Sequence, residues 1–194
     1  MSATSPVTVE EWRAFLTEYS RETLASKDQE VDRAQPGGGV ITVPRFSPEV
    51  LKSGWLGSEP CSEADISAVE ARLGRSLPPS FRNFYLTSNG WSEAGQFGED
   101  VWRIQEIEWL RDGDSSDLIE AWDGALDDDG IEVLRVGLLI AYADGGAGDY
   151  WLLTPPEAGE ESEWTAYQWA AGSGQEPEPV ANFGALMAAQ REKG

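Results

Sequence analysis

The chain of 194 residues contains no histidine and a single cysteine, Cys61. The absence of histidine excludes Ser-His-Asp and Cys-His nucleophile systems, and it excludes zinc sites that combine histidine with cysteine. One cysteine cannot form an internal disulfide, which suits a reducing compartment. No phosphate-binding loop of the type G-x-x-x-x-G-K-[ST] is present. We therefore predict a protein that is not an enzyme and that has no catalytic residues, cofactor or metal site.

Long apolar runs are also missing. The longest covers residues 136–143 and is far too short to cross a bilayer. The first residues, MSATSPVTVEEW, lack the basic and apolar regions of a signal peptide. We expect a cytoplasmic protein that makes no membrane contact. Its 40% hydrophobic residues and nine tryptophans indicate a folded chain, with the length of one domain plus an added segment.

Positive charge is scarce, because 35 acidic residues face only 14 Lys and Arg residues and the formal net charge is −21. Most of this net negative charge lies in residues 92–163, where 20 acidic and three basic residues give −17. Direct binding to nucleic acid is disfavoured, because phosphate contacts need a positive surface. Two interpretations remain open: an acidic surface that only keeps the chain soluble, or a docking surface for a basic partner.

Residues 62–90 read as two short helices joined by a proline corner. Ser62 can cap the first helix with Asp65 as its capping-box partner, and Gly74 stands where this helix would stop. Its apolar positions repeat at helical spacing and are Ile66, Val69 and Leu73. After the prolines, Ser80 is expected to cap a second helix that ends at Asn89-Gly90. The apolar stripe of that helix is Phe81, Phe84 and Tyr85.

The N-terminal residues predict a third helix, over residues 9–25, with Thr8 and Glu11 as a capping box. Its apolar face is Trp12, Phe15, Leu16 and Tyr19. This face either packs onto the main domain or binds a partner. Residues 40–43 are expected to form a strand, and residues 46–60 a loop. We expect residues 1–60 to be an N-terminal extension and residues 61–194 the main domain.

The second half of the chain predicts mostly strands. We expect strands at residues 101–104, 133–143, 150–154 and 164–170, and Gly137 leaves open whether residues 133–143 form one strand or two. The strands at 133–143 and 150–154 are expected to form a hairpin. We also expect a loop at 91–98, a turn of helix that includes Ile107 and Leu110, a short helix at 116–126 and an acidic turn at 127–130. Asp127-Asp128-Asp129-Gly130 does not fit an EF-hand, because the first ligand position would fall on Ala125. Asn182 is expected to cap a last helix that starts at Phe183. The order predicts an α+β fold in which short helices pack on a mostly antiparallel sheet, with an extra N-terminal helix.

Four motifs in this order carry a family resemblance: I-x-x-V-E-x-x-L-G at residues 66–74, F-R-x-F-Y at 81–85, N-G-W at 89–91 and G-D-Y-W-L at 148–152. Together with V-A-N-F at 180–183, they resemble the SUKH superfamily of Smi/Knr-like proteins over residues 61–191. The resemblance implies the same α+β fold. It also implies a bacterial immunity protein that binds and neutralises a cognate polymorphic toxin, often a nuclease. Residues 92–135 contain no motif that aligns with the family.

The acidic middle segment fits such a partner, since a nuclease needs a basic surface to hold its substrate. From charge and expected exposure, we predict a partner-binding surface that includes Trp91, Asp100, Asp127, Asp128, Asp129, Asp144 and Asp149. We expect a monomer or weak dimer that binds a cognate, basic protein toxin. One alternative is a non-enzymatic regulatory or scaffold module of the kind that some fungal members provide in cell-wall synthesis and signalling. A second alternative is a sugar or small-molecule binder, or an enzyme of an unrecognised type.

Overall fold

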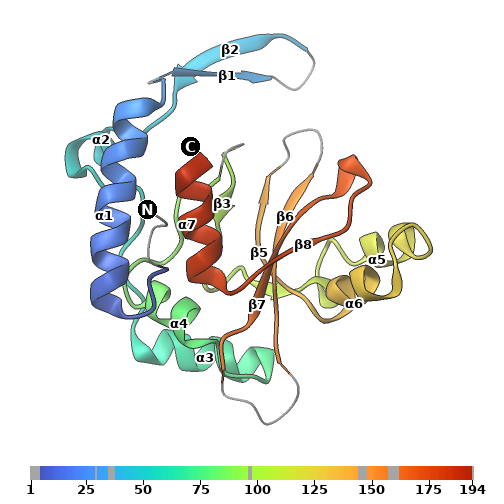
Figure 1. Ribbon diagram of the computed structural model, residues 1–194. Coiled ribbons are helices and arrows are strands. Elements are labelled where there is room, and N and C mark those ends of the chain that lie inside the picture. The colour runs from blue at the N-terminus through green and yellow to red at the C-terminus, as the bar shows by residue number, and fades with distance from the viewer. Residues whose placement is uncertain are drawn as a thin grey trace.

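A six-stranded antiparallel sheet lies at the centre of the computed structural model, which describes residues 5–28, 30–34, 38–95, 98–143, 148–156 and 162–193 (Figure 1). The strand order is β3-β5-β6-β7-β8, and β4 also pairs with β5. The bounds are β3 Asp100–Val101, β4 Glu108–Trp109, β5 Leu138–Ala143, β6 Asp149–Thr154, β7 Thr165–Ala170 and β8 Glu178–Val180. The predicted hairpin of β5 and β6 is confirmed, with a bulge between Leu139 and Ala141.

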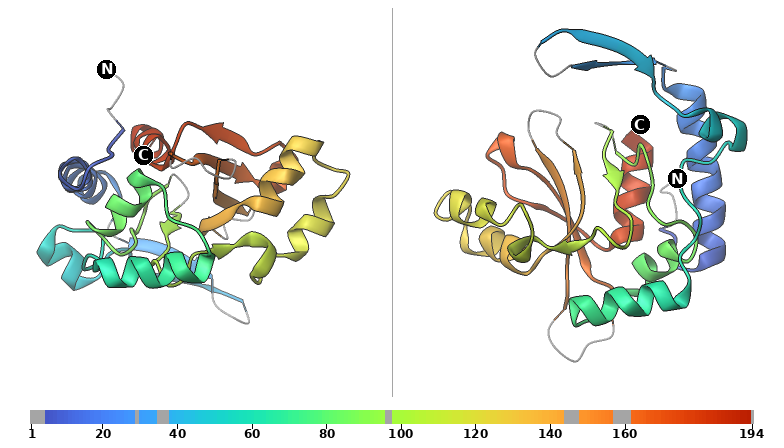
Figure 2. Two further views of the ribbon diagram at one scale, coloured as in Figure 1. Left: turned by 90° about the horizontal axis from the view of Figure 1, so that it is seen from below. Right: turned by 180° about the vertical axis from the view of Figure 1, so that it is seen from behind.

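Helices cover both faces of this sheet, as Figures 1 and 2 show from three directions. One face carries α1 Val9–Ser26, α3 Glu63–Leu73, α4 Pro79–Tyr85 and α7 Phe183–Lys193. The other face carries α5 Asp117–Trp122 and α6 Asp128–Val136, and the 3-10 turns η1 Leu110–Asp112 and η2 Ala171–Ser173 complete this side. The N-terminal part adds the short helix α2 Pro48–Ser53 and a separate two-stranded ribbon of β1 Glu30–Ala34 and β2 Val40–Pro44. The predicted α+β fold with an extra N-terminal helix is confirmed.

Two apolar cores result, one on each face of the sheet. Along β6, Trp151 and Leu153 join the core under α1, α3, α4 and α7, while Tyr150 and Leu152 join the core under α5 and α6. Successive strand residues point to opposite faces, so a sheet covered on both sides can bury both sets of side chains, as it does from Asp149 to Leu153 of β6. The first core contains the predicted helix stripes of α3 and α4, and Phe84 is fully buried against Trp12 and Phe183.

Helix α1 packs onto the main domain, as the first of its two interpretations proposed. Thr8 and Glu11 form the predicted capping box, and the apolar face is buried in the first core. The indole Nε1 of Trp12 donates to the carbonyl oxygen of Ser80 at 2.7 Å, which joins α1 to α4. None of the helices in the described part of the chain has the length and apolar content needed to span a bilayer.

The α3–α4 corner follows the prediction at its start and departs from it afterwards. Ser62 and Asp65 cap α3, and Gly74 ends it in the left-handed region. Helix α4, however, starts after Pro78, so Ser80 lies inside its first turn and is not the cap. The helix also ends at Tyr85, before Asn89-Gly90. Those two residues form a later turn, in which Asn89 Oδ1 accepts from the backbone N of Ile104 at 2.8 Å.

The largest correction concerns residues 127–143, for which we predicted an acidic turn and a long strand. Asp127 instead caps α6, which runs to Val136, and only β5 is extended. Gly137 separates them, and a side chain there would collide with the carbonyl oxygen of Val133, because an added Cβ would lie 2.6 Å away. The β-branched residues of this run favour strands only weakly, and that preference is overridden because α6 buries its Ile131 and Leu134 in the second core.

Smaller differences follow from short elements. The expected loop at 46–60 contains α2, the linker before α7 contains η2 and β8, and β1 was not predicted. The expected strand at 101–104 is reduced to β3, and the turn near Leu110 is β4 followed by η1. Two- and three-residue strands have too few positions to show an alternating pattern, so the sequence carries little signal for them.

Candidate partner-binding surface

Residues 110–136 form an acidic lobe at the end of the molecule that carries α5 and α6, opposite α1 (Figure 1). This segment holds nine acidic residues and two arginines. All nine acidic side chains are exposed: Asp112, Asp114, Asp117, Glu120, Asp123, Asp127, Asp128, Asp129 and Glu132. The structure therefore gathers a large part of the excess negative charge on one connected region.

The two arginines of the acidic lobe neutralise little of this charge. Arg135 lies 3.4 Å from Asp123, and Arg111 lies 3.8 Å from Asp112, and all four side chains are about half exposed or more. Water and salt weaken such exposed pairs, which contribute little to stability. Among the described residues, no lysine or arginine lies within salt-bridge distance of Asp128 or Asp129. These two carboxylates are therefore available to a basic partner.

The N-terminus of α6 brings a fourth carboxylate to Asp127, Asp128 and Asp129. Asp127 Oδ1 accepts from the backbone N of Gly130 at 2.7 Å, and Glu176 Oε1 accepts from the backbone N of Asp127 at 3.0 Å. Gly130 makes room for Glu176, because an added Cβ would lie 1.9 Å from its Oε2. The positive end of the helix dipole offsets part of the repulsion among these acids. Sequence reasoning missed Glu176, since nothing local links it to a helix 49 residues earlier.

Apolar contacts fix the acidic lobe to the sheet. Leu118, Ile119 and Trp122 of α5 pack against the second core, and the Trp122 ring meets that of Trp169 edge to face at 5.4 Å. Helix α6 buries Ile131 and Leu134 in the same core. These contacts fix the backbone that carries the exposed carboxylates.

The structure brings together three of the seven predicted contact residues, Asp127, Asp128 and Asp129. Two others need correction, because the prediction assumed exposure and both are buried. Trp91 is only 2% exposed and packs against Trp55 and Tyr19 in the first core. Asp149 is 4% exposed at the start of β6, and burial raises the pKa of its carboxyl group. Asp144 lies outside the described residues.

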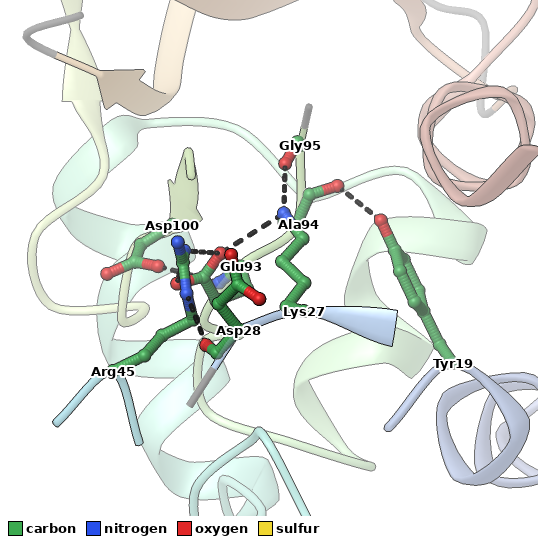
Figure 3. Close-up of polar contacts among 8 residues, drawn as sticks. All are labelled: Tyr19, Lys27, Asp28, Arg45, Glu93, Ala94, Gly95 and Asp100. Carbon is green, nitrogen blue, oxygen red and sulfur yellow. Dashed lines mark hydrogen bonds and ion pairs between the residues drawn. The ribbon is translucent and has the colours of Figure 1, made fainter. Parts of the chain in front are cut away.

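The seventh residue, Asp100, belongs to a different cluster of polar contacts, which we call the Glu93 clamp (Figure 3). Asp100 is exposed at the start of β3, and its Oδ1 accepts from the backbone N of Glu93 at 2.9 Å. The Glu93 carboxylate meets Lys27 at 3.2 Å and Arg45 at 3.0 Å. Arg45 Nε also donates to the carbonyl oxygen of Asp28 at 3.0 Å. Lys27 precedes β1 and Arg45 follows β2, so one carboxylate holds the two chain segments that meet at the base of the ribbon.

Glu93 adopts a backbone conformation that is uncommon for a residue with a side chain, with φ of 55°. Its neighbours hold it there: Tyr19 Oη donates to the carbonyl oxygen of Ala94 at 2.6 Å, and the backbone N of Ala94 bonds to Glu99. The clamp therefore connects α1, the ribbon and the start of the sheet. Sequence reasoning treated this stretch as a loop and had no signal for the two cations that converge on it.

The single cysteine, Cys61, is buried. Burial raises the pKa of the Cys61 thiol to about 11, so the sulfur stays protonated at neutral pH and is a poor nucleophile. In the parts of the chain that the structure describes, no three acidic or thiol side chains converge as metal ligands do. The charged feature that stands out on the described surface is therefore the acidic lobe.

A comparison with protein families gives a match over residues 60–188 to the SMI1 / KNR4 family (SUKH-1). The chain belongs to the SMI1 / KNR4 family (SUKH-1). The motifs that suggested the SUKH superfamily all lie inside this match. No curated protein matches the chain at a significant level.

The SUKH-1 match contains the acidic lobe but not the β1–β2 ribbon. It includes the acidic lobe and Glu93, but it leaves out α1, the β1–β2 ribbon and α2. The ribbon is therefore an addition to the part of the chain that matches the family, and it is fixed to that part through Glu93. Helix α1 is also outside the match, although its apolar face completes the first core.

Proposed function

We propose that this chain is a cytoplasmic bacterial immunity protein, which binds a cognate polymorphic toxin and blocks it without any enzymatic activity of its own. The observation that carries the proposal is the acidic lobe, where Asp128 and Asp129 stand exposed beside Asp127 and Glu176. Membership of the SUKH-1 family is consistent with a toxin-immunity role.

The physical argument concerns the partner's surface. A nuclease must present positive charge to hold the phosphates of its substrate. An acidic lobe can associate with that surface quickly through electrostatic steering and can occupy it, so that the substrate no longer enters. We therefore propose a basic nuclease domain as the toxin. Residues 1–60 are proposed to be an extension of a SUKH domain that covers residues 61–194.

The test uses the C-terminal domain of a secreted, multidomain protein encoded next to this chain. Cells that express the domain should die, and co-expression of this chain should rescue them. An inactive form of the domain should co-purify with the chain. Rescue by a variant that binds no toxin, or failure of the wild-type chain to bind or rescue, would contradict the proposal. A scaffold role would show as a stable complex with a protein that is not toxic.

The absence of enzymatic activity needs its own assay. The purified chain should turn over no nucleic acid, peptide, ester or glycan, because it has no histidine and its one thiol is protonated. Turnover that disappears on substitution of a single carboxylate would show that the chain is an enzyme after all.

A further inference from the structure

The β1–β2 ribbon extends away from the body of the molecule (Figures 1 and 2). Five antiparallel residue pairs join its strands, from Glu30↔Pro44 to Ala34↔Val40, and it pairs with no other strand of the described chain. Such a two-stranded ribbon is at most marginally stable alone, because it has no layer to cover either face. The ribbon also lies outside the SUKH-1 match. A binding partner that covered its faces would stabilise it.

The outer end of the ribbon exposes apolar surface. Four large apolar residues of the described chain are exposed, and two of them, Val40 at 65% and Ile41 at 42%, are neighbours on β2. Consecutive residues of a strand point to opposite faces, so these two side chains place apolar surface on both sides of the ribbon. A flat docking surface would cover only one of them, whereas a cleft would cover both.

The Glu93 clamp holds the ribbon at its base. Lys27 stands just before β1 and Arg45 just after β2, and both pair with Glu93. The three side chains are only 16–22% exposed, so water screens these pairs less than it screens the arginine pairs of the acidic lobe. A ribbon that is fixed before binding loses less conformational freedom in the complex, which favours affinity.

Charge identifies the occupant. Glu30 and Asp32 are exposed on the ribbon, and Thr42 Oγ1 donates to Asp32 Oδ1 at 2.7 Å, which orients that carboxylate. A second copy of this chain would bring another net charge of −21 against these acids, so self-association is disfavoured. Residues 30–44 carry two acids and one arginine, so the ribbon's own charge is only −1, and it is the net charge of the whole chain that favours a basic protein as the occupant. The views of Figures 1 and 2 also show the ribbon running from α1 toward the side that carries α5 and α6.

We propose that the β1–β2 ribbon inserts its outer end into a cleft of the same basic toxin that the acidic lobe attracts, and that Val40 and Ile41 are covered on opposite walls of this cleft. The acidic lobe speeds encounter, while the ribbon slows dissociation and selects the partner by shape. This inference rests on the proposed function and adds a second contact to it.

The experiment measures binding of the inactive C-terminal toxin domain to immobilised chain. Val40→Ser and Ile41→Ser are made separately, and Val7→Ser, at an exposed apolar position outside the ribbon, is the matched control. Each ribbon variant should raise Kd at least about fivefold, mainly through faster dissociation, because each loses a buried apolar contact. The control should stay within about twofold of the wild-type value.

Several results would overturn the ribbon proposal. An effect of only one ribbon variant would mean flat docking, and no effect of either would mean that the ribbon is not a contact. Light scattering should show a monomeric chain; a dimer that the Val40→Ser/Ile41→Ser double variant dissociates would make a second copy the occupant. If the wild-type chain does not bind the domain, the proposed function fails. If the wild-type chain binds the domain and the Kd of both ribbon variants equals the wild-type value, only the ribbon proposal fails.

Discussion

Glu163 caps helix α4 from a position 83 residues beyond Ser80. Its Oε1 accepts from the backbone N of Ser80 at 2.8 Å, and its Oε2 accepts from Ser80 Oγ at 2.6 Å. Pro78, at the cap position, has no side-chain acceptor, so the distant carboxylate satisfies donors that the helix itself leaves free. The Ser80 carbonyl oxygen also accepts from Trp12, and one residue thereby links α1, α4 and the segment before β7.

Removal of this carboxylate should destabilise the fold. Ser80 is fully buried, so Glu163→Ala leaves two donors without water as a substitute, and the free energy of unfolding should fall by about 1–3 kcal/mol. Urea unfolding followed by tryptophan fluorescence measures this change. Glu163→Gln keeps one acceptor and should lose less. Glu120→Ala, at an exposed position of α5, is the control, and an equal loss there would contradict the capping role.

The contrast between Ser62 and Ser80 shows what the sequence could predict. Ser62 has its partner, Asp65, three residues away, so the start of α3 was predictable from local spacing. Ser80 looked like a cap for the same reason, but its acceptor is Glu163, and no short-range pattern reveals that pair. Local capping signals therefore placed α1, α3 and α7 correctly, while contacts made by the finished fold decided α4.

The candidate site shows the same limit. The clustering of charge in residues 92–163 was visible in the sequence, and it correctly indicated an acidic region that includes Asp127. Exposure was not visible: we expected Trp91 and Asp149 to be exposed, and both are buried in the folded chain. The convergence of Lys27 and Arg45 on Glu93 depends on where the ribbon and the loop meet in space. Such a contact has no signature in either segment alone.

Asp127 should contribute to stability as well as to charge. Because its Oδ1 accepts from the backbone N of Gly130, Asp127→Ala removes the cap of α6 and should lower the free energy of unfolding by about 0.5–2 kcal/mol. Asp127→Asn keeps an acceptor in the same place, so its free energy of unfolding should fall by only a small part of that amount. Thermal unfolding of the two variants tests the difference, and equal melting temperatures would argue against the cap.

Glu93 should control the mobility of the ribbon. Glu93→Gln removes the charge that Lys27 and Arg45 share, so the ribbon should open more often while the core stays intact. Amide hydrogen exchange should then become faster at residues 30–34 and 40–44 and remain unchanged in β5 and β6. Arg21→Gln, which removes an exposed ion pair on α1, is the control. Unchanged exchange in the ribbon of the Glu93 variant would show that the clamp does not hold it.

Asp149 should make the stability of the chain depend on pH. Burial raises the pKa of this carboxyl above its ordinary value of 3.8, so the folded state disfavours the ionised form. Below pH 3.8 the carboxyl group is protonated in both the folded and the unfolded state, so it does not lower the free energy of unfolding. As the pH rises from there through the raised pKa, the unfolded state ionises first and stability falls. Asp149→Asn should therefore stabilise the chain at pH 7, and this gain should vanish at low pH. A gain that persists at pH 3 would exclude ionisation as its cause.

The last prediction separates the charge of the acidic lobe from its structural role. Asp128→Lys/Asp129→Lys keeps the Asp127 cap but reverses two exposed charges that have no lysine or arginine partner among the described residues. Association with the inactive toxin domain should slow at least about tenfold at low salt, while dissociation changes much less, because exposed rim charges act mainly on encounter. The effect should shrink at high ionic strength.

Glu10→Lys/Glu49→Lys is the matched control, since it makes the same charge change in the first turns of α1 and α2, away from the acidic lobe. An equal slowing in both variants would mean that only the net charge matters. Unchanged rates in the Asp128/Asp129 variant would remove the acidic lobe from the binding surface.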